Sequence, residues 1–262
     1  MRALSIAATG MAAQQLNVEV IANNIANINT TGYKRSTAEF TDLLYQVERM
    51  QGIPSQAADQ MVPEGAQLGL GTRLSAIRLI NIQGPLAETG NQLDLAINGS
   101  GWFAVQGPNG ETVYTRSGSF NIDSTGQIVT GDGYPLEPAM AVPAGTTALE
   151  VTQAGEIFAT LEGQADPLAI GQLTLANFMN PAGLNALGGN LFQATEASGA
   201  AVSGLPGSIS FGRIQQGYLE NSNVDPVREI TELISAQRAY EMNSKVIQAA
   251  DDMAGVVSKG IR

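Results

Sequence analysis

The sequence predicts an α+β fold in which the N- and C-terminal helices are paired as a coiled coil, with an all-β domain of short strands and hairpins inserted between them. Apolar residues recur every seven positions at both ends of the chain, which is the pattern of coiled-coil helices. Residues 84–217 are instead rich in glycine, threonine and alternating apolar residues, which is typical of short strands joined by tight turns. We therefore expect four segments: residues 1–30, 31–83, 84–217 and 218–262.

The N-terminal helix, expected over residues 1–30, carries two lines of apolar side chains. The first line is spaced by seven residues and consists of Leu4, Met11, Val18 and Ile25, and the second consists of Ala7, Ile21 and Ile28. Arg2 and Glu19 are the charged residues among the first 28. Because a two-helix hairpin in water needs a charged outer face, we predict that this helix packs against further copies of the chain. Burial inside its own domain is the alternative.

Asparagines gather at the end of this helix, in the stretch ANNIANINTTGYKRS of residues 22–36. Asn23 and Asn27 share a helix face, and Asn24 lies on a neighbouring face. Because an amide both donates and accepts hydrogen bonds, we expect these side chains to contact backbone that packs against them. Asn29 and Gly32 provide the turn that ends the helix. A frayed helix end is the alternative explanation.

Residues 31–83 form the linker to the β domain. The stretch EFTDLLYQVERM, residues 39–50, is compatible with a short helix. The following stretch, GIPSQAADQMVPEGAQLGLG, is rich in turn residues and predicts an extended loop. The pattern leaves the conformation of residues 45–72 open.

The β domain, expected over residues 84–217, shows regular hairpin signals. Asn109-Gly110, Thr125-Gly126 and Asp132-Gly133 each fall between alternating apolar runs. Trp102 and Phe103 are neighbours in a predicted strand and therefore face opposite sides. We expect one of them in the core and the other at a packing surface for another subunit.

The C-terminal helix falls in the segment of residues 218–262. Its residues spaced by seven are Leu233, Tyr240, Ile247, Ala254 and Ile261, and its second line is Ala236, Ala250 and Val257. Asp225 is suited to cap the helix and Pro226 to its first position. Glu229 and Glu232 suit its early turns, because carboxylates near a helix N-terminus oppose the macrodipole.

Composition excludes several functional classes. The net charge is −11, and residues 37–225 hold 18 acidic and 5 basic side chains, so neither nucleic acid nor an anionic membrane is an expected partner. Histidine and cysteine are both absent, which removes the commonest general base, disulfides and thiolate metal sites. No run of 18 apolar residues is present, so no integral membrane segment is expected, and the N-terminus lacks the apolar block of a cleaved signal peptide.

Three stretches imitate chemical motifs without their required context. NGSGWFA, residues 98–104, contains G-x-G-x-x-A, but a strand follows where a dinucleotide site needs a helix. NIDSTGQ, residues 121–127, is better explained as a hairpin turn than as a calcium loop, because its first position lacks a carboxylate. Asp251 and Asp252 diverge on a helix and are expected to be surface charges. We predict no catalytic residue, cofactor or metal ligand.

Three long motifs resemble the flagellar rod and hook protein family. ANNIANINTTGYKRS is similar to its N-terminal signature, and ENSNVDPVREITELISAQRAYEMNSKVI, residues 220–247 with Asn243, is similar to its C-terminal signature. LDLAINGSGWFAV and YTRSGSFNIDSTGQIVTGDGYPL resemble the core of the family's β domain. The chain length and the insertion-like residues 45–72 are most similar to the distal rod members of the family.

The resemblance implies a structural subunit that polymerises helically into a rigid, hollow drive shaft, which transmits torque through the periplasm to the hook. It implies that the terminal helices line a central channel, that the β domain forms an outer layer, and that the chain leaves the cell through the flagellar type III export apparatus without a cleaved signal. The implied partners are further copies of the chain, the proximal rod proteins, the hook protein, and the periplasmic and outer-membrane ring proteins that act as a bushing. Self-assembly would use the spaced apolar residues and the amides of the two signatures.

Two alternatives stay open at this point. The chain is also compatible with a proximal rod or hook subunit of the same family, and the conformation of residues 45–72 would discriminate between them. From a different class, a carboxylate-only enzyme acting on periplasmic glycan is the other alternative, although the strands suggest no paired carboxylates.

Overall fold

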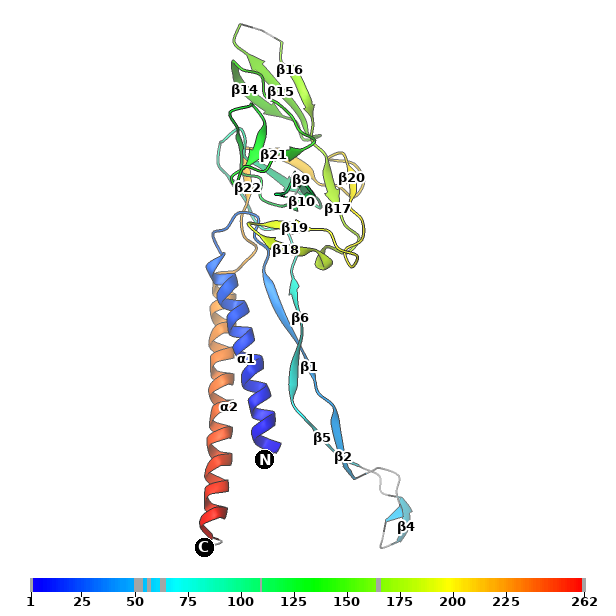
Figure 1. Ribbon diagram of the computed structural model, residues 1–262, viewed down its shortest axis with the longest axis vertical. Helices are drawn as coiled ribbons and strands as arrows, with labels where there is room; N and C mark the ends of the chain where they lie inside the picture. Colours follow the sequence, from blue (N-terminus) through cyan, green and yellow to red (C-terminus); the bar gives the residue numbers. More distant parts are fainter. Residues whose placement is uncertain are drawn as a thin grey trace. The chain divides into compact units, whose positions relative to one another are not determined.

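The computed structural model describes residues 2–49, 54–55, 58–61, 65–108, 110–163 and 166–260 (Figure 1). The chain divides into two compact units. Unit 1 combines Met1–Ile25, Ser36–Arg78 and Pro226–Arg262, and unit 2 combines Ala26–Arg35 and Leu79–Asp225. The predicted α+β class is confirmed, because helices near both ends of the chain flank a strand-rich region.

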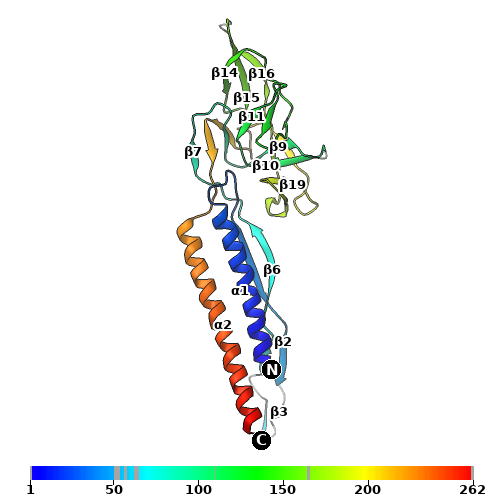
Figure 2. The same ribbon diagram turned by 60° about the vertical axis from the view of Figure 1, so that its left-hand side comes forward.

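Unit 1 contains the two long helices. Helix α1 spans Arg2–Ala26 and helix α2 spans Pro226–Gly260. They run side by side in opposite directions in both views (Figures 1 and 2). They come close at Gly10, where an added Cβ would lie 2.9 Å from the side-chain amide nitrogen of Asn243. The small residue at position 10 therefore permits the close approach of the two helices.

Unit 1 also contains a ribbon of paired strands. β1 (Ser36–Asp42) pairs with β6 (Thr72–Leu79), β2 (Tyr45–Arg49) with β5 (Ala66–Gly69), and β3 (Pro54–Ser55) with β4 (Ala58–Met61). The expectation of a short helix over residues 39–50 is wrong, because residues 39–42 and 45–49 are strands. Tyr45 lies opposite Gly69, and the Leu43 amide donates to the Gly71 carbonyl at 2.8 Å. Pairing with a distant segment, which a local pattern does not contain, therefore decides this conformation.

Unit 2 is built on a seven-stranded sheet. The strand order is β18-β19-β10-β9-β17-β20, and β13 also pairs with β9. These strands span β9 Trp102–Gln106, β10 Thr112–Thr115, β13 Leu136–Glu137, β17 Leu175–Asn177, β18 Asn185–Gly188, β19 Leu191–Gln193 and β20 Val202–Gly204. The register places Phe103 opposite both Thr115 on β10 and Leu175 on β17.

Smaller sheets complete unit 2. A three-stranded sheet contains β14 (Thr146–Val151), β15 (Glu156–Leu161) and β16 (Leu168–Gln172). Three strand pairs are β11 (Phe120–Ile122) with β12 (Ile128–Thr130), β8 (Leu95–Asn98) with β21 (Arg213–Gln216), and β7 (Leu86–Glu88) with β22 (Tyr218–Glu220). A short 3-10 helix spans Pro181–Gly183.

The predicted turns at two glycines are observed. Gly126 and Gly133 have φ of 83° and 87°, values that favour glycine, and their amides close turns on Asp123 and Thr130. The third predicted turn begins at Asn109, which lies outside the described residues. The strands on either side of it, β9 and β10, pair antiparallel.

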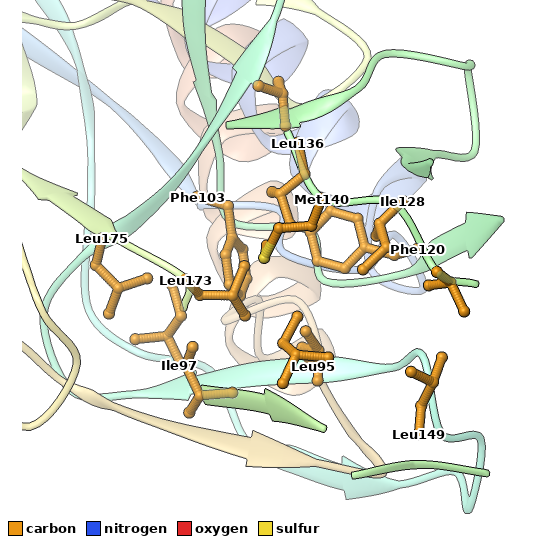
Figure 3. Close-up of a cluster of buried hydrophobic side chains, with 14 of the residues drawn as sticks. Leu95, Ile97, Phe103, Phe120, Ile128, Leu136, Met140, Leu149, Leu173 and Leu175 are labelled. Carbon is orange, nitrogen blue, oxygen red and sulfur yellow. The ribbon is translucent and has the colours of Figure 1, made fainter. Parts of the chain in front are cut away.

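The main core of unit 2 lies between these sheets (Figure 3). Phe103 is fully buried there and meets the ring of Phe120 edge to face at 5.2 Å. Trp102, on the opposite side of β9, is also buried, against Phe192 at 4.9 Å. The expectation that one of these two aromatic residues forms a surface for another subunit is therefore wrong, because a second apolar cluster covers the Trp102 side of the strand.

Candidate assembly site and its buried charge network

The amide-rich end of α1 makes hydrogen bonds inside unit 1. The Asn24 side chain, buried to 1% exposure, donates to the Ser36 carbonyl at 2.8 Å and to the Glu229 carboxylate at 3.1 Å. Its amide oxygen accepts from the Ser36 backbone N–H at 2.9 Å. One side chain therefore joins the end of α1, the start of β1 and the first turns of α2. Glu229, which was expected to suit an early turn of the helix, is fully buried in this arrangement.

The other predicted amides and the turn differ from Asn24 in their environment. Asn23 is exposed, and Asn27 is half-buried and accepts from the Thr30 hydroxyl at 3.1 Å. Gly32 is buried in unit 2 with φ of 71°, and its amide donates to the Glu220 carbonyl at 2.7 Å. A Cβ at Gly32 would lie 2.8 Å from the backbone nitrogen of Ser117. Glycine is required at this turn for both its φ and its space.

The predicted apolar lines of the helices are only partly covered. Leu4, Met11, Val18 and Ile25 on α1 are half-buried, and Ile21 is buried. On α2, the half-buried residues are Leu233, Asn243, Ile247 and Ala254, whereas Tyr240 is 42% exposed. The second-line residues Ala7 and Ala236 are buried. Ile261 lies outside the described residues.

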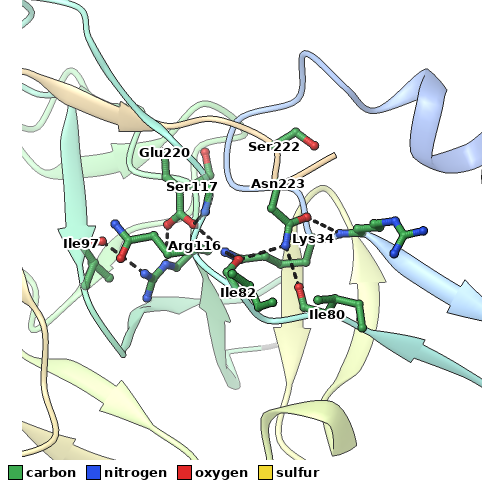
Figure 4. A network of polar contacts seen from close by, with 12 residues as sticks. Lys34, Ile80, Ile82, Ile97, Arg116, Ser117, Glu220, Ser222 and Asn223 are labelled. Carbon is green, nitrogen blue, oxygen red and sulfur yellow. Dashed lines mark hydrogen bonds and ion pairs between the residues drawn. The ribbon is translucent and has the colours of Figure 1, made fainter. Parts of the chain in front are cut away.

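A buried ion cluster in unit 2 was not singled out by the sequence. The Glu220 carboxylate accepts from Lys34 at 2.5 Å and from Arg116 at 2.6 Å (Figure 4). All three side chains are at most 6% exposed. The same carboxylate accepts from the Gly84 amide at 2.9 Å. One buried anion therefore holds two cations that come from distant parts of the chain.

Backbone carbonyls complete the coordination of the two cations. Lys34 also donates to the Ile82 carbonyl at 3.0 Å. The Arg116 guanidinium donates to the Gly99 carbonyl at 2.6 Å, to the Ile97 carbonyl at 3.2 Å and to the Gly101 carbonyl. A guanidinium presents its donors in a fixed fork, so this fan of carbonyls fixes its orientation. The loop after β8 is held in place by the same side chain.

Burial and charge act in opposite directions on these groups. Burial by itself raises the pKa of Glu220, but Arg116 and Lys34 outweigh it and hold that pKa below its usual value. Burial lowers the pKa of Lys34, and the attraction of Glu220 offsets part of this effect. Since two cations share one carboxylate, the cluster depends on Glu220 remaining charged.

Asn223 extends the network along the chain. Its side chain accepts from the Arg35 amide at 2.7 Å and donates to the Ile80 and Ile82 carbonyls at 2.8 and 2.9 Å (Figure 4). Residues 35, 80 and 223 lie close to the points where the chain passes between the two units. Asn223 and the ion cluster thus fasten these segments of unit 2 to one another.

A sequence signal for this network existed but was incomplete. Lys34 lies in the N-terminal signature, and Glu220 and Asn223 lie in the C-terminal signature, so the ends of these motifs were visible. Their pairing was not visible, because Lys34 and Glu220 are 186 positions apart. Arg116 was the other available signal, because a single basic residue directly after a strand with buried residues indicates a buried charge that needs a partner.

The described residues contain no group of three or more His, Cys, Asp or Glu side chains able to hold a metal ion. Within the same residues, no helix is long and apolar enough to cross a membrane. Asp251 and Asp252 are exposed, as expected of surface charges. The buried ion cluster of unit 2 has its hydrogen-bonding groups satisfied by its own chain, and the helices of unit 1 keep apolar side chains exposed.

Comparison with known proteins identifies the family. Family models match three segments: "Flagella basal body rod protein" residues 4–34, "Flagellar hook protein FlgE/F/G D1 domain" residues 96–159, and "Flagellar basal body rod FlgEFG protein C-terminal" residues 215–259. The flagellar basal-body rod protein FlgG of Agrobacterium fabrum is 58% identical over 100% of both chains. FlgG of Caulobacter vibrioides is 51% identical over 99% of both chains, and FlgG of Bacillus subtilis is 35% identical over 97% of this chain and 96% of its own.

The chain belongs to the flagellar basal-body rod protein family. It is a structural protein of the bacterial flagellum and not an enzyme. The alternative of a glycan-acting enzyme is therefore not supported, and the predicted family resemblance is confirmed.

Proposed function

We propose that this chain is the distal rod subunit, which polymerises helically into a rigid, hollow drive shaft that transmits torque through the periplasm to the hook. The relatives from Agrobacterium fabrum, Caulobacter vibrioides and Bacillus subtilis that match over 96% or more of their length are named as the rod protein FlgG, which supports the rod assignment. The shaft grows by a head-to-tail contact that does not close on itself, since such contacts generate helical filaments.

The observation that carries this proposal is the uncovered apolar surface of α2. Its large apolar side chains remain exposed along the whole described helix: Val227, Ile230, Ile234, Tyr240, Met242, Val246, Met253 and Val256. A helix in a self-sufficient soluble domain directs charged residues to water. Contiguous exposed apolar surface instead marks a site of association.

We propose that the terminal segments, residues 1–30 and 218–262, pair as a coiled coil and form the channel-lining layer of the shaft. Its contacts would be made by Leu4, Met11, Val18, Ile21, Ile25, Leu233, Tyr240, Ile247 and Ala254, together with Asn23, Asn24, Asn27, Gly32 and Asn243. Most of these apolar side chains are half-buried, which supports this assignment, because part of each side chain is still exposed and can be covered by a neighbouring copy. Residues 31–83 and 84–217 would be the linker and the β domain.

The partners would be further copies of the chain, the proximal rod proteins, the hook protein and the ring proteins around the shaft. The chain would reach the periplasm through the flagellar type III export apparatus without a cleaved signal peptide. The family membership supports an assembly partner among rod and hook proteins.

Electron microscopy of basal bodies from a strain with an in-frame deletion of the gene tests the proposal. We expect a rod that stops short and carries no hook, and the length of the stump separates a distal from a proximal position. A complete rod that lacks only the hook would assign the chain to the hook. An unaltered flagellum would contradict a rod function.

A further inference from the structure

One stretch of unit 2 is almost without charge, although the chain as a whole is strongly acidic. The full sequence has 24 acidic and 13 basic residues, whereas residues 167–212 contain one charged residue, Glu196. This stretch supplies β16, β17, β18, β19 and β20. Copies of a chain with a net charge of −11 repel one another, so a low-charge surface is where they can approach at the smallest electrostatic cost.

Among the described strands, the seven-stranded sheet ends at two edges inside this stretch. Its outermost strands are β18 on one side and β20 on the other (Figure 1). All four residues of β18 are exposed, as are Val202 and Ser203 of β20. An edge strand presents unpaired backbone N–H and carbonyl groups to any strand that approaches.

Neither edge carries the residues that normally block such pairing. Charged side chains and proline are two of the features that protect edge strands, besides bulges and short length, and the sequences Asn-Ala-Leu-Gly of β18 and Val-Ser-Gly of β20 contain neither of these two. The ribbon of unit 1 shows the contrast within the same chain. β1 and β6 carry Glu39, Asp42, Arg73 and Arg78.

Exposed apolar side chains flank the β20 edge. Val202 is 61% exposed, and Met179 and Ile209 are 94% and 95% exposed. Asn177 connects the strand to the segment that follows it. It lies opposite Val202 in the sheet, and its side-chain amide donates to the Ser210 carbonyl, next to Ile209, at 3.0 Å. At the β18 edge, Leu187 is 49% exposed. Both edges therefore combine open backbone groups with apolar side chains.

We propose that the β20 edge of one copy docks on the β18 edge of the next copy, so that their seven-stranded sheets are joined side by side. The inference rests on the proposed polymeric function and names a contact within that polymer. A second copy is the occupant because each edge strand is itself uncharged and offers the exposed apolar side chains and the open backbone groups that the other edge needs. Since the two edges differ, the contact runs head to tail and does not close.

Cysteine crosslinking tests this contact directly, because the natural chain has no cysteine. Leu187→Cys and Val202→Cys are combined in one chain that replaces the natural one in cells. Isolated hook–basal bodies are treated with a short bismaleimide and separated on a denaturing gel. We expect a ladder of dimers, trimers and longer chains from the double variant, and monomers from either single variant.

The matched control combines Leu187→Cys with Ile122→Cys. Ile122 is also exposed but lies on β11, outside the seven-stranded sheet, so this pair is expected to stay monomeric. Assembled shafts that yield only monomers from the edge pair would overturn the proposal, as would dimers from Val202→Cys alone or crosslinks to a different protein. Absence of the chain from isolated shafts would instead contradict the proposed rod function.

A second variant gives an independent readout if the cysteines disturb assembly. Ser203→Lys places a charge on the β20 edge, and Ser124→Lys places one on an exposed turn of the same unit. We expect loss of complete shafts and of swarming with Ser203→Lys and normal shafts with Ser124→Lys. Normal shafts with both variants would show that β20 is not an edge used in assembly.

Discussion

The two units of this chain reach stability in different ways. Unit 2 has a closed apolar core, and its three central ionised groups are buried and paired within the unit. In unit 1, α2 leaves large apolar side chains in water along its described length, and every residue of β2 is exposed. Unit 2 therefore has a large core of its own, whereas the long helix of unit 1 keeps much of its apolar surface exposed. The difference predicts which substitutions affect folding and which affect assembly.

The largest expected effect is on assembly, from a charge on the helices of unit 1. Ile25→Asp or Ile247→Asp should abolish shaft formation, because an unpaired carboxylate would be buried where copies pack. Unit 2 should stay folded. Trp102, the single tryptophan, is buried in unit 2, so its fluorescence reports that fold independently of assembly. Ile122→Asp, at an exposed position of β11, is the control and should form normal shafts. Normal shafts from Ile25→Asp would contradict the proposal that these helices pack between copies.

The next effect is on the stability of unit 2. Glu220→Ala leaves Lys34 and Arg116 buried without their counter-charge and should cost about 3–5 kcal/mol in free energy of unfolding. Urea denaturation followed by tryptophan fluorescence measures it. Glu111→Ala, in the same unit, removes an exposed hydrogen bond from the Gln193 side chain at 2.8 Å and should change stability by less than about 0.5 kcal/mol. Equal costs for the two variants would show that the cluster does not stabilise unit 2.

A smaller effect is expected at the amide that joins three elements of unit 1. Asn24→Ala leaves the half-buried N–H and carbonyl of Ser36 without this partner and should cost about 1–3 kcal/mol. Circular dichroism during thermal unfolding follows the helices. Gln15→Ala removes an exposed hydrogen bond to Glu19 and should change stability by less than about 0.5 kcal/mol. Similar melting of both variants would argue against a role of Asn24 in unit 1.

The last effect is the response of unit 2 to acid. The folded pKa of Glu220 lies below its unfolded value, which is about 4.3 for a free glutamate. The charged Glu220 therefore stabilises the folded state fully above the unfolded pKa, and this stabilisation is lost as the pH falls through the folded pKa. It amounts to about 1.4 kcal/mol for each unit by which the folded and unfolded pKa values differ. Glu220→Gln should flatten the dependence of unfolding free energy on pH in this range. Parallel curves for the two proteins would exclude the carboxylate as a source of acid sensitivity.

Local patterns predicted the elements whose stabilising information lies within one stretch of chain. The sevenfold spacing predicted α1 and α2, and the glycines at positions 126 and 133 predicted turns that require positive φ. Residues 39–49 escaped prediction because their partners lie 17 or more positions ahead, on β5 and β6. The expectation that either Trp102 or Phe103 faces another subunit was wrong because the residues that cover Trp102, including Phe192, come from distant strands.

The sequence by itself determined the α+β class, the two terminal helices, the absence of histidine and cysteine chemistry, and the family. The tertiary structure decided that Asn24 is buried against Ser36 and Glu229, and that Lys34 and Arg116 meet on Glu220. The physical reason is the range of the interactions. Periodicity and turn geometry act over a few residues, whereas a buried ion cluster exists only once folding has brought distant residues together and removed them from water.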